Sequence, residues 1–307
     1  FSKTPEATNM ITQVWTNLGT PASYRTMDGN GVHAFKLVNA LGKTIFAKFR
    51  WISRQGVKNL NGEQVAKANF NFLTDDLYGQ ISAGNHPSWD LMVQTMSADQ
   101  FASLNYNPFD DTKEWLGVPF KKIGEMTLNK VPDNFFEYTE QSAFAPSNMV
   151  PGIEPSPDRQ RYRVGANVMT LPVNAPRVKV VNNNQDGQLN RDERSADVNY
   201  FPADTAPKAT AAEFRNSTYE VAGMVDSKPI AKTNNFEQAG IFYRSLKAQD
   251  KADLIKNLAG DLGQVTSPRT KTIMVSYFYQ ADKDYGTRLA KAVNVPLSNV
   301  TKAAAEY

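Results

Sequence analysis

The sequence contains no cysteine and only two histidines, His33 and His86, among its 307 residues. The absence of cysteine excludes disulfides, thiolate metal sites and a cysteine nucleophile within this sequence. Two histidines are also too few for most zinc, copper and non-haem iron sites, which draw several ligands from the same small set of residue types. The residue inventory therefore removes most metalloproteins and all thiol enzymes from consideration.

Charge blocks and long hydrophobic runs are also absent. The chain carries 34 basic and 31 acidic residues, a net charge of +3, with no lysine or arginine block that could grip phosphates. A nucleic-acid partner is therefore not expected. No apolar run reaches the ~18 residues that a membrane helix needs, so no membrane partner is expected either. Hydrophobic residues make up 41% of the chain, which is typical of a globular protein with a sizeable core.

The pattern of apolar residues predicts an α+β fold. Alternating residues predict four strands, at 33–39, 44–51, 89–96 and 121–130. A hairpin loop at 40–43 and turns at 28–31 and 107–110 separate them. Helical spacing predicts helices at 5–18, 62–83 and throughout 236–307. Four antiparallel strands are too few to close a barrel that holds a ligand, so either another part of the polypeptide completes the sheet or the chain dimerises through it.

The predicted helices indicate which apolar side chains form the core. These residues recur at helical spacing in each segment. They are Met10, Ile11, Val14, Trp15, Val65, Phe72, Leu77, Ile81, Ile241, Phe242, Leu246, Leu254, Ile255, Leu258, Leu262, Ile273, Val275, Phe278, Leu289 and Val293.

A proline-punctuated apolar stretch at 137–159 is the most informative segment of the chain. It runs from Glu137 to Arg159 and is too apolar for a solvated loop. We interpret it as an extended segment threaded across a protein interior and ending on a buried carboxylate, Asp158. The domains are predicted accordingly: strands and helices at 1–130, a threading and wrapping segment at 131–235, and a helical domain at 236–307.

This segment resembles the threading segment of the monofunctional haem catalases, and short matches in the same order extend over nearly the whole chain. They include Pro5-Glu6-Ala7, Gly19-Thr20-Pro21-Ala22-Ser23-Tyr24-Arg25, Asp28-Gly29-Asn30-Gly31-Val32-His33, Asn107-Pro108-Phe109-Asp110, Trp115-Leu116-Gly117-Val118-Pro119, Leu171-Pro172-Val173-Asn174, Gln238-Ala239-Gly240 and Asp284-Tyr285-Gly286. The motifs at 28–33 and 115–119 look most like the branch shared by plant and some bacterial enzymes. The resemblance implies the second half of an antiparallel β-barrel, the threading segment and a C-terminal helical domain.

The resemblance also implies a function and a set of site residues. The function is the disproportionation of hydrogen peroxide to water and oxygen by a homotetramer that binds haem b (heme b). His33 resembles the histidine beneath the haem that pairs with the aspartate ending the threading segment, here Asp158. Arg163 resembles an arginine that pairs with a haem propionate, and Val32 resembles a residue that lines the wall of the haem pocket on the side of His33. The residues alone also allow a plainer interpretation, with His33 as a satisfied strand histidine and Arg163 as a surface charge.

Three features of the family have no counterpart in this sequence. The distal histidine and asparagine lie in an N-terminal region that the chain does not match, and the tyrosine that ligates the iron lies in a turn that is missing where Arg159 joins Gln160. Tyr162 is near this position but in a different register. No catalytic residue and no metal ligand is therefore assigned. We expect the chain to be part of a longer catalase; the alternative is a haem-free, non-enzymatic subunit of the same fold.

Three further predictions concern ligands and location. Leu18 and Ile52 stand where nicotinamide-binding relatives carry basic residues, so no bound NADPH is expected. The stretch 182–193 matches the spacing of a calcium loop, although a polar surface loop explains it as well. The resemblance favours the periplasm, with the cytoplasm as the alternative.

Overall fold

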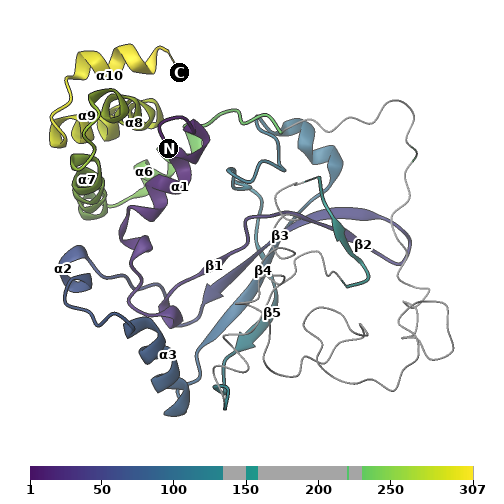
Figure 1. Ribbon diagram of the computed structural model, residues 1–307. Coiled ribbons are helices and arrows are strands. Elements are labelled where there is room, and N and C mark those ends of the chain that lie inside the picture. Colours follow the sequence, from purple (N-terminus) through teal and green to yellow (C-terminus); the bar gives the residue numbers. More distant parts are fainter. Residues whose placement is uncertain (134–149, 158–219, 221–229, 307) are drawn as a thin grey trace, which may run out of the picture.

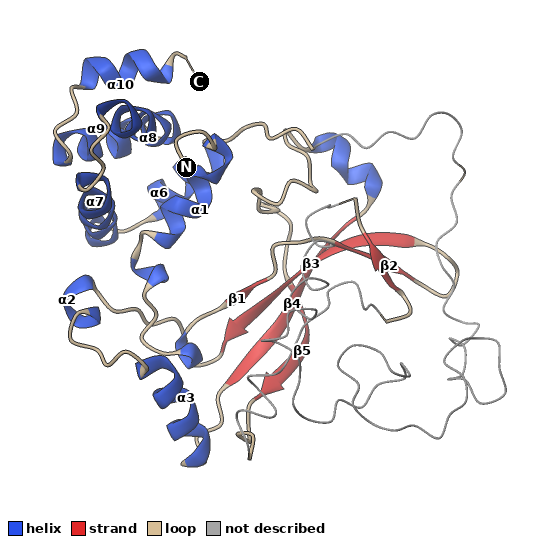
Figure 2. Cartoon of the chain, viewed as in Figure 1, coloured by secondary structure: helices blue, strands red, loops and turns tan. Residues whose placement is uncertain are grey.

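The computed structural model describes residues 1–133, 150–157, 220 and 230–306. In these ranges an antiparallel sheet stands beside a cluster of helices (Figures 1 and 2). The strands are β1 (Gly29–Asn30), β2 (Phe35–Val38), β3 (Thr44–Ser53), β4 (Ser88–Met96), β5 (Lys121–Thr127) and β6 (Ile153–Pro155). The α-helices are α1 (Thr8–Val14), α2 (Gly62–Val65), α3 (Phe72–Ser82), α6 (Glu237–Ser245), α7 (Ala248–Gly263), α8 (Pro268–Ala281), α9 (Lys283–Ala292) and α10 (Leu297–Ala304). Short 3-10 helices η1 (Pro5–Ala7), η2 (Asn17–Gly19), η3 (Tyr24–Thr26) and η4 (Ala98–Ser103) complete the described elements.

The sheet confirms the predicted α+β class and the antiparallel pairing. Its strand order is β5-β4-β3-β2-β6, and β1 pairs with β3 beside this path. The predicted hairpin at 40–43 joins β2 to β3, and Gly42 has φ 77°, a value that glycine adopts without strain. Among the described strands β5 and β6 stand at the two ends of the order. What continues the sheet beyond these ends stays a prediction. Within the described ranges, no helix is long and apolar enough to span a membrane.

Two sequence predictions about the first strands are wrong. The turn predicted at 28–31 contains β1, where Gly29 and Asn30 pair with Trp51 and Arg50 of β3. The first predicted strand begins at Phe35, two residues later than expected, because the residues between β1 and β2 leave the ladder. Local composition suggested a turn; long-range pairing with β3 decided otherwise.

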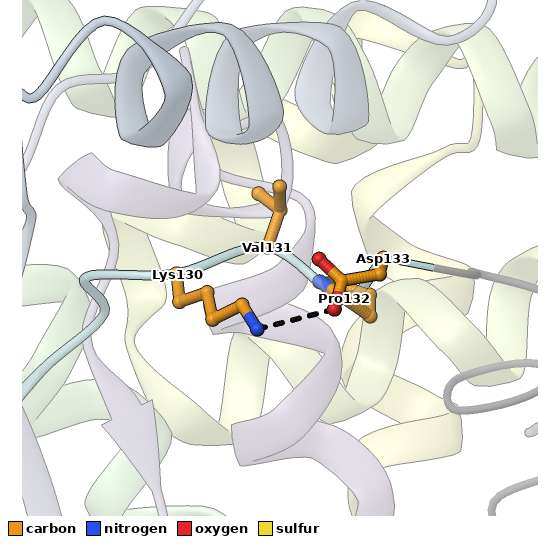
Figure 3. A pocket seen from close by; sticks show the side chains of 4 residues that line it. All are labelled: Lys130, Val131, Pro132 and Asp133. Carbon is orange, nitrogen blue, oxygen red and sulfur yellow. Dashed lines mark hydrogen bonds and ion pairs between the residues drawn. The ribbon is translucent and has the colours of Figure 1, made fainter.

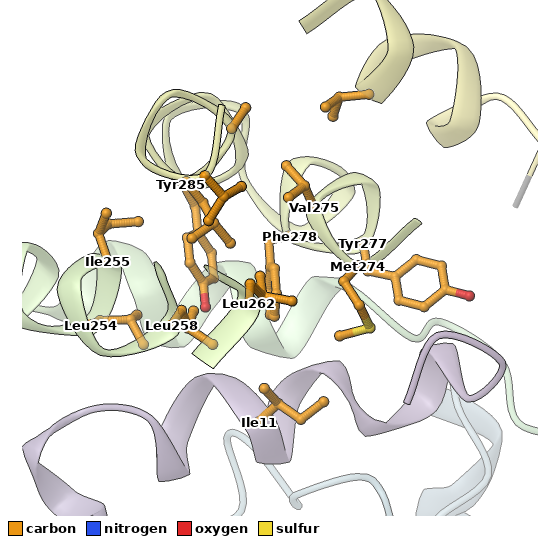
Figure 4. Close-up of a cluster of buried hydrophobic side chains, with 14 of the residues drawn as sticks. Ile11, Leu254, Ile255, Leu258, Leu262, Met274, Val275, Tyr277, Phe278 and Tyr285 are labelled. Carbon is orange, nitrogen blue, oxygen red and sulfur yellow. The ribbon is translucent and has the colours of Figure 1, made fainter. Parts of the chain in front are cut away.

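The C-terminal helices share one hydrophobic core with α1, which comes from the start of the chain (Figure 4). Leu254 and Leu258 of α7, Val275 and Phe278 of α8, and Leu289 of α9 are each at most 3% exposed. Helix starts are capped as the sequence requires: Ser267 accepts a hydrogen bond from the backbone N–H of Thr270, and Asp282 from those of Asp284 and Tyr285. The stripe predicted for 236–307 is therefore largely confirmed, with Ile241 exposed instead of buried.

The first helix buries only part of the predicted face: Ile11 is in the core and Trp15 packs against it. Thr8, Ile11 and Thr12 are buried, whereas Met10 and Val14 are each 48% exposed. The buried positions follow helical spacing. The Thr8 hydroxyl donates to the carbonyl of Pro5 in η1, and the Thr12 hydroxyl donates to the carbonyl of Thr8. In α3 only Ile81 of the predicted residues is fully buried, and Leu77 is half-buried.

A loop between β4 and β5 joins the sheet to the helices. The Trp115 side chain is 1% exposed, and its ring N–H donates to the carbonyl of Pro108 at 2.9 Å. The Gln238 amide of α6 bonds both the N–H and the C=O of Glu114, each at 2.9 Å. This reciprocal pair fixes the loop on α6, so the helical cluster and the sheet hold one another through it. The predicted domain boundaries after 130 and 235 stay predictions.

A buried ion cluster reinforces the same loop. The Asp110 carboxylate, 1% exposed, accepts from the Lys232 ammonium at 2.7 Å and from the backbone N–H of Thr112 at 2.9 Å. Lys232 also bonds Asp111, and Lys113 lies 3.5 Å from Asp110. Burial alone would raise the pKa of Asp110, but its hydrogen bonds from Lys232 and Thr112 outweigh burial and lower it. Burial lowers the pKa of Lys113.

Candidate functional site

The candidate site is built on a bulge between β1 and β2. Asn30 pairs with Arg50 and Phe35 pairs with Ala47, so four residues, 31–34, stand opposite only two residues of β3. The two extra residues cannot enter the ladder and are displaced from it. Val32 is 49% exposed as a result, and His33 is half-buried. Bulges of this kind redirect side chains, and this one presents the two residues that the sequence singled out.

A glycine makes the bulge possible. The Gly31 N–H donates to the carbonyl of Phe49 at 3.0 Å, which draws the two backbones close together. A Cβ at position 31 would lie 2.7 Å from that carbonyl oxygen, closer than real Cβ atoms come. Only glycine therefore fits this approach.

The bulge ends on an apolar floor. Ala34 is completely buried and packs in a cluster with Met96 and Trp115. Aromatic rings extend this cluster: Phe46 lies 5.2 Å from Phe101 and 4.9 Å from Phe109, measured between ring centroids. The rigid floor fixes the backbone next to His33, and hence the position from which its imidazole projects.

The last described part of the threading segment runs along this bulge. In β6, Ile153 pairs with Leu37, Glu154 with Lys36 and Pro155 with Phe35, so the segment advances toward lower residue numbers of β2. The Ser156 hydroxyl then donates to the Ala34 carbonyl at 2.6 Å. A 2.6 Å ion pair between Lys36 and Glu154 fixes the register. The segment is thus directed at His33 where the described stretch ends, at residue 157.

The structure places two of the four predicted site residues. Val32 and His33 lie together on the bulge, while Asp158 and Arg163 lie outside the described residues, as do Tyr162 and the calcium-like stretch 182–193. The pairing of His33 with Asp158 therefore stays a prediction.

Sequence reasoning missed the residues that shape the site. Gly31, Ala34 and Ser156 make the bulge, its floor and its link to the threading segment. The spacing Gly29-Asn30-Gly31 carried a signal, since glycines within a strand pattern often mark a bulge. No local signal predicts the bond from Ser156 to Ala34, which joins residues 122 positions apart.

Two cavities in the described ranges lie away from the bulge. One, of about 370 Å³, is lined by Lys130 to Asp133 just after β5, where Lys130 and Asp133 form an exposed ion pair at 3.2 Å (Figure 3). The other, of about 330 Å³, lies between α8 and α10. Neither includes Val32 or His33. The described residues also contain no group of three or more histidine, aspartate or glutamate side chains that could hold a metal ion.

Comparison with solved structures identifies the fold. A bacterial catalase superposes with a TM-score of 0.76 at 29% identity, over 95% of this chain and 64% of that one. A fungal catalase superposes with a TM-score of 0.77 at 28% identity, over 96% of this chain and 63% of that one. The sheet, the bulge and the C-terminal helices thus define a protein with the catalase fold.

Sequence comparison identifies the family. Residues 1–207 match the catalase family, and residues 229–293 match a domain described as catalase-related immune-responsive. A catalase of Vibrio cholerae is 52% identical over 320 residues, which cover 99% of this chain and 64% of the relative. A catalase of Vibrio vulnificus is 54% identical over 324 residues, with 99% and 64% covered, and one of Pseudomonas aeruginosa 46% over 321, with 100% and 62%. The chain belongs to the catalase family, and it spans about 64% of the length of the first of these relatives.

Proposed function

We propose that this chain is part of a haem catalase that disproportionates hydrogen peroxide to water and oxygen. The single observation that carries the proposal is the family membership, with catalases of Vibrio at 52% and 54% identity over 99% of the chain. The bulge supports it, because it presents His33 and Val32 where the threading segment arrives.

The alignments also support a longer enzyme. The match to the Vibrio cholerae catalase extends over 320 positions, more than the 307 residues of this chain. The relative therefore carries internal residues that this chain lacks. We propose that some of them form the turn with the iron-ligating tyrosine, between positions equivalent to Arg159 and Gln160.

The two described site residues, Val32 and His33, fit the rim of a haem group, and neither is assigned as its axial ligand. A half-buried imidazole and an exposed valine share one bulge beside an apolar floor, which suits the edge of a flat, largely apolar group. A haem iron needs an axial ligand, and none of the proposed site residues takes that role. When bound, the group supplies the redox chemistry, so no catalytic step is assigned to this chain's side chains.

Four residues would hold the group, and two of them would act as a pair. The His33 imidazole would donate to the Asp158 carboxylate, which would keep the ring in one orientation. The Arg163 guanidinium would pair with a propionate through two hydrogen bonds. Val32 contributes apolar contact. We further propose that the group is haem b, that the enzyme is a homotetramer and that it binds no NADPH.

The two histidines of the sequence provide a matched test. In the full-length enzyme, His33→Ala should lower haem content and increase the rate of haem loss to an apo-acceptor protein, measured from the Soret band. His86→Ala, at an exposed position between α3 and β4, should match the parent in both. Oxygen release from peroxide is measured alongside. A colourless, inactive parent enzyme would refute the proposal in favour of a haem-free subunit, and equal haem retention in both variants would remove His33 from the site.

A further inference from the structure

A pair of buried tyrosines occupies the centre of the helical core. Tyr243 of α6 and Tyr285 of α9 stack face to face, with ring centroids 4.4 Å apart and planes inclined by 4°. Tyr243 is 1% exposed and Tyr285 is fully buried. Parallel stacking of this kind is favourable when the rings are offset, and it holds the two side chains against each other in the core.

Tyr243 has a proton acceptor within hydrogen-bond distance. Its hydroxyl donates to Oδ2 of Asp284 at 2.6 Å and accepts from the Arg288 guanidinium at 3.2 Å. Burial, together with the hydrogen bond to Asp284, raises the pKa of Tyr243 to about 12. At neutral pH the phenol therefore keeps its proton, and ordinary base or nucleophile chemistry is closed to it. The Asp284 side chain is 62% exposed, so a proton that reaches it can pass on to solvent.

We propose that Tyr243 is a site of one-electron oxidation, at which the phenolic proton moves to Asp284 as the electron leaves. The oxidant is a one-electron oxidant formed from hydrogen peroxide, so the inference rests on the proposed function. The step balances: Tyr243 loses one electron and one proton, the oxidant gains the electron, and Oδ2 of Asp284 gains the proton. The product is a neutral tyrosyl radical hydrogen-bonded to a carboxylic acid.

The charges around the ring require proton loss in this step. The Lys251 ammonium lies 4.7 Å above the Tyr243 ring centroid, and Arg288 bonds its oxygen. Both would repel a cationic ring, whereas a neutral radical experiences no such repulsion. The two oxygens of the existing hydrogen bond lie 2.6 Å apart, so proton transfer along it removes the charge of the ring without a conformational change.

The proton acceptors of the two stacked rings favour Tyr243 over Tyr285 as the site of oxidation. Among the described residues, the hydrogen-bond partner of the Tyr285 hydroxyl is the Thr12 hydroxyl at 3.4 Å, and a hydroxyl is a far weaker base than a carboxylate. Tyr285 instead shields one face of the Tyr243 ring, and Phe278 packs against Tyr285 at 4.9 Å. A radical at Tyr243 is thereby protected from water and from coupling to another molecule.

Flash photolysis of the full-length enzyme tests the site independently of its haem. Tris(bipyridine)ruthenium with persulfate generates a one-electron oxidant, and freeze-quench electron paramagnetic resonance detects tyrosyl radicals. We expect Tyr243→Phe to lower the radical yield at least fivefold. Asp284→Asn should slow radical formation about tenfold and reduce its solvent deuterium isotope effect. Tyr277→Phe is the matched control, since Tyr277 is also 1% exposed but bonds a backbone carbonyl, that of Ser2; it should leave the signal unchanged.

Two results would overturn the proposal. One is an equal radical yield in Tyr243→Phe and the parent. The other is a photochemical radical at Tyr243 with none there after hydrogen peroxide is added to active enzyme. Oxygen release from peroxide is measured on the same samples, so loss of the radical site and loss of catalase activity are separate outcomes.

Discussion

The buried ion cluster at Asp110 gives the sharpest stability prediction. Lys232→Met removes the ammonium that bonds Asp110 at 2.7 Å and leaves a carboxylate only 1% exposed. Lys113 remains at 3.5 Å, too far for a strong hydrogen bond, and its own pKa is lowered by burial. Breaking a buried pair by removing one partner costs about 3–5 kcal/mol. Since Thr112 still donates two hydrogen bonds to Asp110, we expect the lower end, about 3 kcal/mol.

Chemical denaturation of the parent and the variant measures this loss. Lys130→Met is the control, because it is the same substitution in an ion pair whose side chains are 73% and 80% exposed. An exposed pair of this kind contributes about 0–0.5 kcal/mol. A loss below about 1 kcal/mol for Lys232→Met, or equal losses in the two variants, would refute the reasoning.

The pH dependence of this stability loss tests whether the ion pair with Asp110 causes it. The lowered pKa of Asp110 means that this carboxylate contributes stability above its unfolded pKa of about 3.9, and that the contribution is lost as pH falls through the lower folded value. The difference between parent and Lys232→Met should therefore be full at neutral pH and shrink below pH ~4. A difference that stays constant into acid would assign the loss to packing of the lysine stem instead.

Two further predictions concern the helical core. Gly286→Ala should destabilise the protein by roughly 3 kcal/mol or more, because the new Cβ would lie 2.3 Å from the Cα of Tyr279. The control, Gly260→Ala in α7, meets no atom within 4 Å and should stabilise the protein by about 0.5–1 kcal/mol. Thermal unfolding compares the two variants, and equal effects would contradict the close packing at Gly286. The pKa of Tyr243 is raised to about 12, so its contribution to stability is complete below pH ~10 and is lost as pH rises toward 12. Absorbance titration of the phenolates should show one tyrosine fewer ionising near pH ~12 in Tyr243→Phe than in the parent. A difference between the two that appears near pH ~10 instead would contradict the raised pKa.

Much of the architecture followed from local sequence pattern. Alternation placed β3, β4 and β5, and helical spacing placed α7, α8 and α9, because these elements are long enough for their period to be read. The family resemblance rested on motifs whose residue types could be compared directly, and the comparisons confirmed the family. Asp158 and Arg163 stay predictions of that resemblance.

Errors arose where burial depends on a distant partner. Met10 and Val14 looked like core residues, but α6 meets the opposite face of α1 and leaves them in solvent. Ile241 is exposed for a similar reason, since a helical stripe is wider than the contact that its neighbours make.

By itself, the sequence determined the α+β class, the longer strands and helices, and the family, since all of these depend on residues close together along the chain. Only the tertiary structure decided that 31–34 bulge out of the sheet opposite two residues of β3, that Ser156 secures the threading segment to Ala34, and that Tyr243 meets Asp284. Each of these contacts depends on register between segments far apart in the chain, and register is fixed by the pairing and packing of whole elements rather than by any local pattern.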